Sequence, residues 1–149
     1  MTMSAEQILE KASPLARRFR ALFVERLGHL GYTEEFSDRY ELAIAAPHPD
    51  VGELRVRDDG DELTISLGPH HWHVPEYMFD GETEARRPDL AAEAAVEDVR
   101  GVVEGRTVLR VARRNGRIGS TMTYDPDAHV PPLAADETEY TWTGPRKAP

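Results

Sequence analysis

Residues 40–74, YELAIAAPHPDVGELRVRDDGDELTISLGPHHWHV, contain three successive runs in which apolar and polar side chains alternate. The runs are residues 40–46, 54–57 and 62–68. Alternation with a period of two is typical of a strand that buries one face. The segments between the runs hold Pro47, Pro49 and the turn Asp58-Asp59-Gly60-Asp61, all of which favour a reversal of the chain. We therefore expect three consecutive antiparallel strands here.

The segments on either side of these strands have the apolar spacing of helices. Ser4-Ala5-Glu6-Gln7 has the composition of a capping box, in which the first and fourth residues bond each other's backbone. Ser13-Pro14 is typical of an N-cap followed by the first residue of a helix. The first helical region is thus predicted to divide at Pro14. A second helix is expected after Pro88-Asp89, and Gly105 closes it.

The C-terminal third again has the pattern of strands. Two alternating runs, residues 107–113 and 117–124, flank Asn115-Gly116. Both residues of this pair tolerate positive φ, which suits a type I′ hairpin turn. Tyr140 and Trp142 alternate with polar residues and indicate a short final strand.

The order of elements is α-β-β-β-α-β-β, with a final β after it. It predicts an α+β fold with a single antiparallel or mixed sheet of about five strands and two helices packed on one face. Residues 1–149 are expected to form one domain, since a chain of this length suffices for a single core. Residues 1–3 and 144–149 are expected to be flexible tails.

Composition narrows the classes of function. The net charge of −9 speaks against a nucleic-acid binder, which needs a basic face for the phosphates. There is no cysteine, which excludes disulfides and thiolate chemistry. No apolar run is long enough to span a membrane and the N-terminus has no signal-peptide pattern, so a cytoplasmic location is expected. The 16 arginines against two lysines indicate a bacterial genome rich in G and C.

Common catalytic signatures are missing from the sequence. It contains no G-x-S-x-G, no Walker A loop, no G-x-G-x-x-G and no H-E-x-x-H. This favours a protein that is not an enzyme and needs no cofactor.

The most unusual segment is Pro69–Pro75, which holds three of the six histidines and one of the two tryptophans. His71 and His73 are two residues apart, so both could reach one divalent metal ion, with His48 or a carboxylate such as Glu76 as a third ligand. One hypothesis is therefore a metal-binding or small-ligand-binding protein, open to a hydrolytic role. Its cluster would be His48, His70, His71 and His73.

The other hypothesis, which we favour, is a module that binds another protein. Aromatic and histidine side chains border an acidic loop at residues 76–84, and Trp and Tyr often anchor interfaces. The predicted partner-binding residues are Trp72, His71, His73, Tyr77 and Phe79. A homodimer formed through the open sheet face or the first helix is a third option.

The element order, small size and acidic charge are similar to those of type III secretion chaperones and of small bacterial immunity proteins. The similarity covers most of the chain but includes no shared motif. Both families bind other proteins without catalysis, so the resemblance implies a protein-binding role. The chain departs from the chaperone pattern at its C-terminus, which has the pattern of a strand and a tail in place of a helix.

Overall fold

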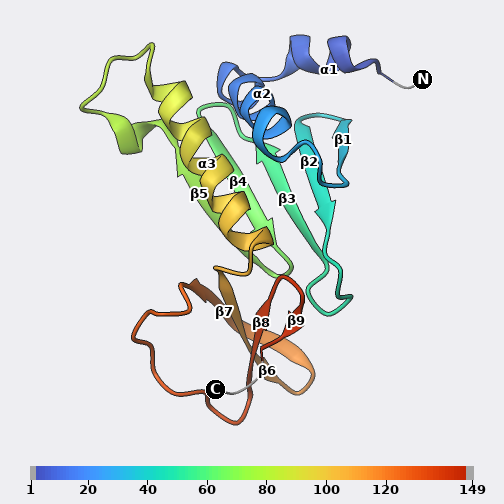
Figure 1. The fold of residues 1–149 in the computed structure, drawn as a ribbon, viewed down its shortest axis with the longest axis vertical. Coiled ribbons are helices and arrows are strands. Elements are labelled where there is room, and N and C mark those ends of the chain that lie inside the picture. Colours follow the sequence, from blue (N-terminus) through green and yellow to red (C-terminus); the bar gives the residue numbers. More distant parts are fainter. Residues whose placement is uncertain (1–2, 147–149) are drawn as a thin grey trace.

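The computed structural model describes residues 3–146 and has an α+β fold with two antiparallel sheets (Figure 1). The first sheet has five strands in the order β1-β2-β3-β4-β5, and the second has four in the order β7-β6-β8-β9. The strands of the first sheet are β1 Thr33–Phe36, β2 Tyr40–Ala45, β3 Glu53–Asp58, β4 Glu62–Leu67 and β5 His70–Pro75. Those of the second are β6 Val108–Arg114, β7 Arg117–Tyr124, β8 Glu137–Thr141 and β9 Gly144–Pro145.

Three α-helices and one short 3-10 helix complete the fold. They are α1 Ala5–Lys11, α2 Pro14–Leu27, η1 Glu76–Phe79 and α3 Arg87–Val103. In Figure 1, α2 and α3 lie side by side over one face of the first sheet, and α1 lies apart from it. The core between the helices and the sheet is built from leucine, phenylalanine, valine and alanine side chains with almost no exposed surface.

The expected division of the N-terminal helical region at Pro14 is confirmed. Ser4 and Gln7 form the predicted capping box of α1, and the Ser13 hydroxyl accepts a hydrogen bond from the Ala16 amide at 3.0 Å. Asp58, at the end of β3, adds a contact from far along the chain. Its carboxylate accepts bonds from the Ser13 amide at 2.8 Å and from the Ser13 hydroxyl at 2.7 Å. The start of α2 is therefore tied to the sheet.

The prediction of one sheet is wrong, because the C-terminal strands form a sheet of their own. Only residues 104–107 separate α3 from β6, so β6 begins where the helix ends, beyond the end of the first sheet (Figure 1). The position beside β4 is already occupied by β5. Asn115 and Gly116 have φ of 53° and 74°, which agrees with the predicted hairpin turn.

The predicted tails are partly corrected as well. Gly144 and Pro145 pair with Thr141 and Tyr140 as β9, so the chain is still within the second sheet at this point. Arg146 follows with an ion pair to Glu139 at 3.5 Å. Residues 1, 2 and 147–149 lie outside the described part of the chain.

If the strand at residues 62–68 ran on unbroken, His71 and His73 would share the face of Ile65, and Trp72 would point the other way. The histidine segment is instead a separate strand, β5, and this facing is reversed. The chain turns back at Gly68, whose φ is +54°, and Pro69. Ile65 then pairs with Trp72 and Ser66 with His71. Directly paired residues of antiparallel strands share a face. Trp72 therefore lies on the helix-covered face with Ile65, and His71 lies on the open face, as does His73.

The open face of the first sheet carries charged side chains in ion pairs. Arg55 on β3 reaches Glu41 on β2 at 2.7 Å and Glu35 on β1 at 3.5 Å. Such exposed pairs add little stability, but they make this face polar. Within residues 3–146, no helix combines the length and the apolar character needed to cross a membrane.

Candidate functional site

The five predicted partner-binding residues do not form one continuous surface. Trp72 faces the helices, whereas His71 and His73 stand on the open face, with ring centroids 5.4 Å apart. Tyr77 lies in η1 and is 67% exposed, and Phe79 at the end of η1 packs against the core.

The predicted metal ligands His48, His71 and His73 are not brought together. His48 lies in the loop between β2 and β3, and its ring packs against Gly144, where an added Cβ would stand 2.7 Å from Cδ2. In the described part of the chain, one group of three has ligand atoms all within 4.8 Å of one another. That group is Asp59, Glu62 and His73.

This Asp59–Glu62–His73 group is already neutralised by the protein. Arg39 and Arg57 both form ion pairs with Asp59, and the Thr64 hydroxyl donates a hydrogen bond to it. Burial opposes the ionised form, but the bonds from Thr64 and Arg57 outweigh it and lower the pKa of Asp59. A metal ion would have to displace two guanidinium groups, so this group has the character of a structural ion-pair network.

A first hollow lies beside η1, and we call it the acidic depression. It has a volume of about 270 Å³. Its lining residues are Asp61, Glu76, Tyr77, Asp80, Glu84 and Arg87. Tyr77 lines the hollow and is 67% exposed, and the next residue in η1, Met78, is 61% exposed.

The charges of the acidic depression are poorly balanced. Among the described residues its one basic lining side chain is Arg87, which lies 3.9 Å from Asp80 and donates to the backbone carbonyls of Asp80 and Glu82. Within residues 3–146, Asp61, Glu76 and Glu84 have no ion pair. Burial raises the pKa of Glu76, and the nearby Asp61 raises it further while Arg87 opposes both. The negative charge here is thus under-compensated.

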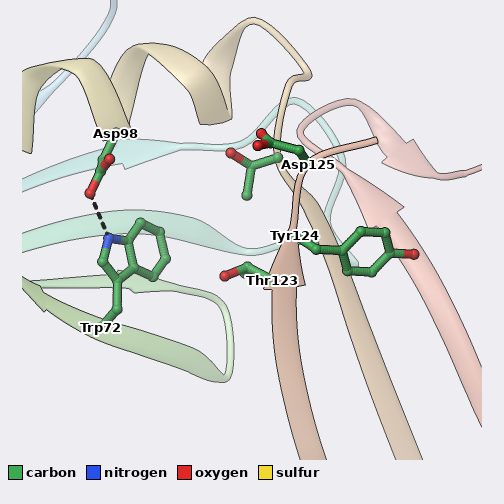
Figure 2. A pocket seen from close by; sticks show the side chains of 6 residues that line it. Trp72, Asp98, Thr123, Tyr124 and Asp125 are labelled. Carbon is green, nitrogen blue, oxygen red and sulfur yellow. Dashed lines mark hydrogen bonds between the residues drawn. The ribbon is translucent and has the colours of Figure 1, made fainter. Parts of the chain in front are cut away.

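A second hollow, the junction pocket, lies where α3, β5 and β7 meet (Figure 2). It has a volume of about 240 Å³. Its lining residues are Trp72, Asp98, Thr107, Thr123, Tyr124 and Asp125. The Trp72 indole N–H donates to the Asp98 carboxylate at 2.9 Å, and Figure 2 shows the Thr123 hydroxyl pointing toward the indole.

Asp98 is the half-buried carboxylate of the junction pocket. Burial raises the pKa of Asp98. The hydrogen bond from Trp72 lowers it in part, and the charge of the neighbouring Glu97 raises it further. Asp125 follows the last residue of β7 and is exposed. Two carboxylates from distant parts of the sequence therefore share one pocket.

His70 connects the two sheets next to this pocket. Its Nδ1 lies 2.8 Å from the Thr121 hydroxyl and its Nε2 lies 3.4 Å from the Thr123 hydroxyl, both on β7. Burial lowers the pKa of His70, and the neighbouring His71 lowers it further. The neutral imidazole is therefore favoured at this contact.

Trp72, which lines the junction pocket, and Tyr77, which lines the acidic depression, were named from the sequence as candidate partner-binding residues. Met78 and the other lining residues of the junction pocket were not. Asp98 carried a signal, because it falls in helical phase with the apolar positions Ala91, Ala95 and Val102 and so interrupts the stripe that α3 buries. Thr107, between α3 and β6, carried none. Neither did Thr123 and Asp125, since the packing of β7 against β5 is what brings them to Trp72.

Comparison of this chain with protein-family models, with curated proteins and with solved structures finds no match.

Proposed function

We propose that this protein works by binding another protein, without catalysing a reaction, and that the acidic depression receives a basic segment of that partner. The observation that carries the proposal is the exposure of Tyr77 in a hollow whose carboxylates Asp61, Glu76 and Glu84 have no ion pair within residues 3–146. Met78, the next residue in η1, is exposed as well.

Charge complementarity argues for a basic partner. Asp61, Glu76 and Glu84 face the same hollow. Burial raises the pKa of Glu76, and repulsion by Asp61 raises it further. A lysine or arginine side chain in the depression would relieve this repulsion. The net charge of −9 would also attract a cationic segment and speed its encounter with the protein.

The apolar side chains argue for a protein over an isolated cation. Tyrosine supplies a large contact area with few rotatable bonds and is common among residues that dominate binding energy. Methionine is flexible and adapts its shape to a partner. An extended basic segment with apolar residues among its lysines and arginines would contact Tyr77, Met78 and the carboxylates together.

Site-specific photo-crosslinking in the native host tests the proposal. A photoreactive phenylalanine analogue at position 77 should yield a cross-linked partner peptide with a net positive charge, identified by mass spectrometry. The same analogue at Ile118, which is 47% exposed on β7, is the matched control and should not yield that peptide.

Charge reversal supplies the second arm of this experiment. Changing Glu84 to Lys should abolish the position-77 adduct while leaving the fold intact, because this side chain is exposed. The proposal fails if position 77 gives no specific adduct, if the captured peptide is acidic, or if position 118 captures the same peptide equally well.

A further inference from the structure

We infer that the junction pocket is a binding site for a small organic cation, with one ammonium or guanidinium group on a short apolar body. The inference is independent of the acidic depression, since the two hollows lie toward opposite ends of β5. It assigns a second, separate binding site to the chain.

The charge of the pocket selects the ligand's charge. Asp98 and Asp125 both line it, and no lysine, arginine or histidine among residues 3–146 does. Within residues 3–146, neither carboxylate has an ion pair. One oxygen of Asp98 accepts the bond from Trp72, and the other has no bond to a protein group in the described structure. That oxygen is available to accept a charge-assisted hydrogen bond from a cation.

The walls of the pocket select an organic cation. The Trp72 indole forms one wall, and cations bind favourably over the face of this ring. The bond to Asp98 fixes the indole, so little conformational freedom remains to be lost on binding. The hydroxyls of Thr107 and Thr123 can accept further N–H bonds from the same ligand.

Other ligand classes fit the pocket less well. A metal ion needs several oxygens around it, and in the described residues the ligand atoms of the pocket form no group of three within 4.8 Å. An anion would meet two carboxylates. The volume of about 240 Å³ lies below the range of roughly 300–1,000 Å³ that is usual for drug-sized ligands, which points to a cation about as large as an amino-acid side chain.

Nuclear magnetic resonance of the two indole N–H groups tests the inference on the full chain. Butylammonium and butylguanidinium should shift the Trp72 indole signal in a saturable way. The signal of Trp142, which is buried and does not line this pocket, should stay in place as an internal control. Butanol and butyrate, which have similar apolar bodies but no positive charge, should leave the Trp72 signal unchanged.

Two variants and a matched control assign the shift to the pocket. Asp98→Asn keeps an acceptor for the indole and removes the charge, so the cation should bind at least about tenfold more weakly. Asp125→Asn should weaken it less, because this side chain is exposed. Asp127→Asn, a nearby exposed carboxylate that does not line the pocket, should bind like the parent. If Asp98→Asn does not fold, Asp125→Asn against Asp127→Asn decides the question.

The cation that binds here could be a free small molecule or an arginine side chain of a partner protein, and a capped arginine amide distinguishes the two. Binding of the free alkyl cations supports a small-molecule ligand, and binding of the capped amide alone supports an arginine side chain of a partner. Either result supports a cation site. The inference is overturned if no cation shifts the Trp72 signal, if butanol shifts it equally, or if Trp142 responds in parallel.

Discussion

His70 shows how one residue can make the contact between the two sheets sensitive to acid. Its imidazole lies between the hydroxyls of Thr121 and Thr123, with His71 as the neighbouring titratable group. Burial and His71 hold the folded-state pKa below the usual value of about 6.5. The folded protein therefore disfavours the protonated ring more than the unfolded chain does.

We predict that His70 lowers stability in acid. Since the folded-state pKa is below the unfolded one, its contribution is complete above about pH 6.5 and is lost as the pH falls through the folded-state pKa. The His70→Gln variant keeps a side chain that can bond both threonines but does not titrate. Urea unfolding from pH 7.5 to pH 5 should show the wild type losing more stability than this variant.

A difference in unfolding free energy between these two proteins that stays constant, or that favours the wild type more strongly at low pH, would contradict this assignment. Because Glu76 and Asp98 also have raised pKa values, only the difference between the two proteins isolates His70.

At the level of elements, the start of α2 depends on a carboxylate from the sheet. Asp58 is 7% exposed and accepts bonds from the Ser13 amide, the Ser13 hydroxyl and the Gly60 amide. Replacing it with alanine leaves these donors without their partner. We predict a loss of about 2–3 kcal/mol of unfolding free energy.

Urea denaturation measures this loss. Asp50→Ala, in the loop between β2 and β3, is the control, because that carboxylate is exposed and should cost less than about 0.5 kcal/mol. Equal losses in the two variants would show that Asp58 does not hold α2 to the sheet.

The hairpin between β4 and β5 depends on Gly68. Its φ is +54°, and an added Cβ would stand 2.7 Å from the Val51 carbonyl oxygen. Gly60 also has positive φ, at +92°, but an added Cβ there meets nothing within 4 Å. Gly60→Ala should therefore cost only the backbone strain, about 1–2 kcal/mol.

Gly68→Ala adds a clash with backbone to that strain and should lower the thermal unfolding midpoint more than Gly60→Ala does. If the two alanine variants unfold at the same temperature, the close approach of Gly68 to Val51 does not contribute to stability.

The sequence pattern predicted those helices and strands in which buried side chains recur at a regular spacing. Alternation predicted β2, β3 and β4, and Ser13-Pro14 predicted the start of α2, because a single buried face or a cap leaves a mark within a few residues. It missed β1, whose four residues are mostly polar. It also missed β5, because its histidines give no clear alternation of apolar and polar residues and because prolines lie at both ends of the segment. Pairing β6 with β8 and not with the first sheet depends on distant contacts that no short window contains.

The same division applies to the candidate sites. Tyr77 was predicted because an aromatic residue beside acidic ones is visible in the sequence itself. The junction pocket was not, because Trp72, Asp98 and Asp125 come from three elements that meet only through the packing of α3 and β7 against β5. Because the chain turns back at Gly68, Trp72 lies on the helix-covered face, and His71 and His73 lie on the open face. A strand that ran on unbroken from β4 would have the opposite arrangement.

At the scale of the whole molecule, the chain has an under-compensated acidic hollow at one end of β5, and the second sheet lies at the other (Figure 1). The net charge of −9 attracts a cationic segment over a long range, and this attraction contributes to its binding. We predict that such binding weakens as salt rises from about 0.05 M to 0.5 M, since screening shortens the reach of these charges.

Fluorescence anisotropy with a labelled peptide measures whether the protein binds a basic segment. The probe is a capped peptide that alternates arginine or lysine with leucine, and its counterpart carries glutamine in place of the basic residues. Only the basic peptide should bind. Tyr77→Ala with Met78→Ala should weaken this binding at least about tenfold, while Ile118→Ala with Met122→Ala on β7 should leave it unchanged. Equal binding of the two peptides, or equal affinity of the two double variants, would contradict the proposed binding of a basic partner.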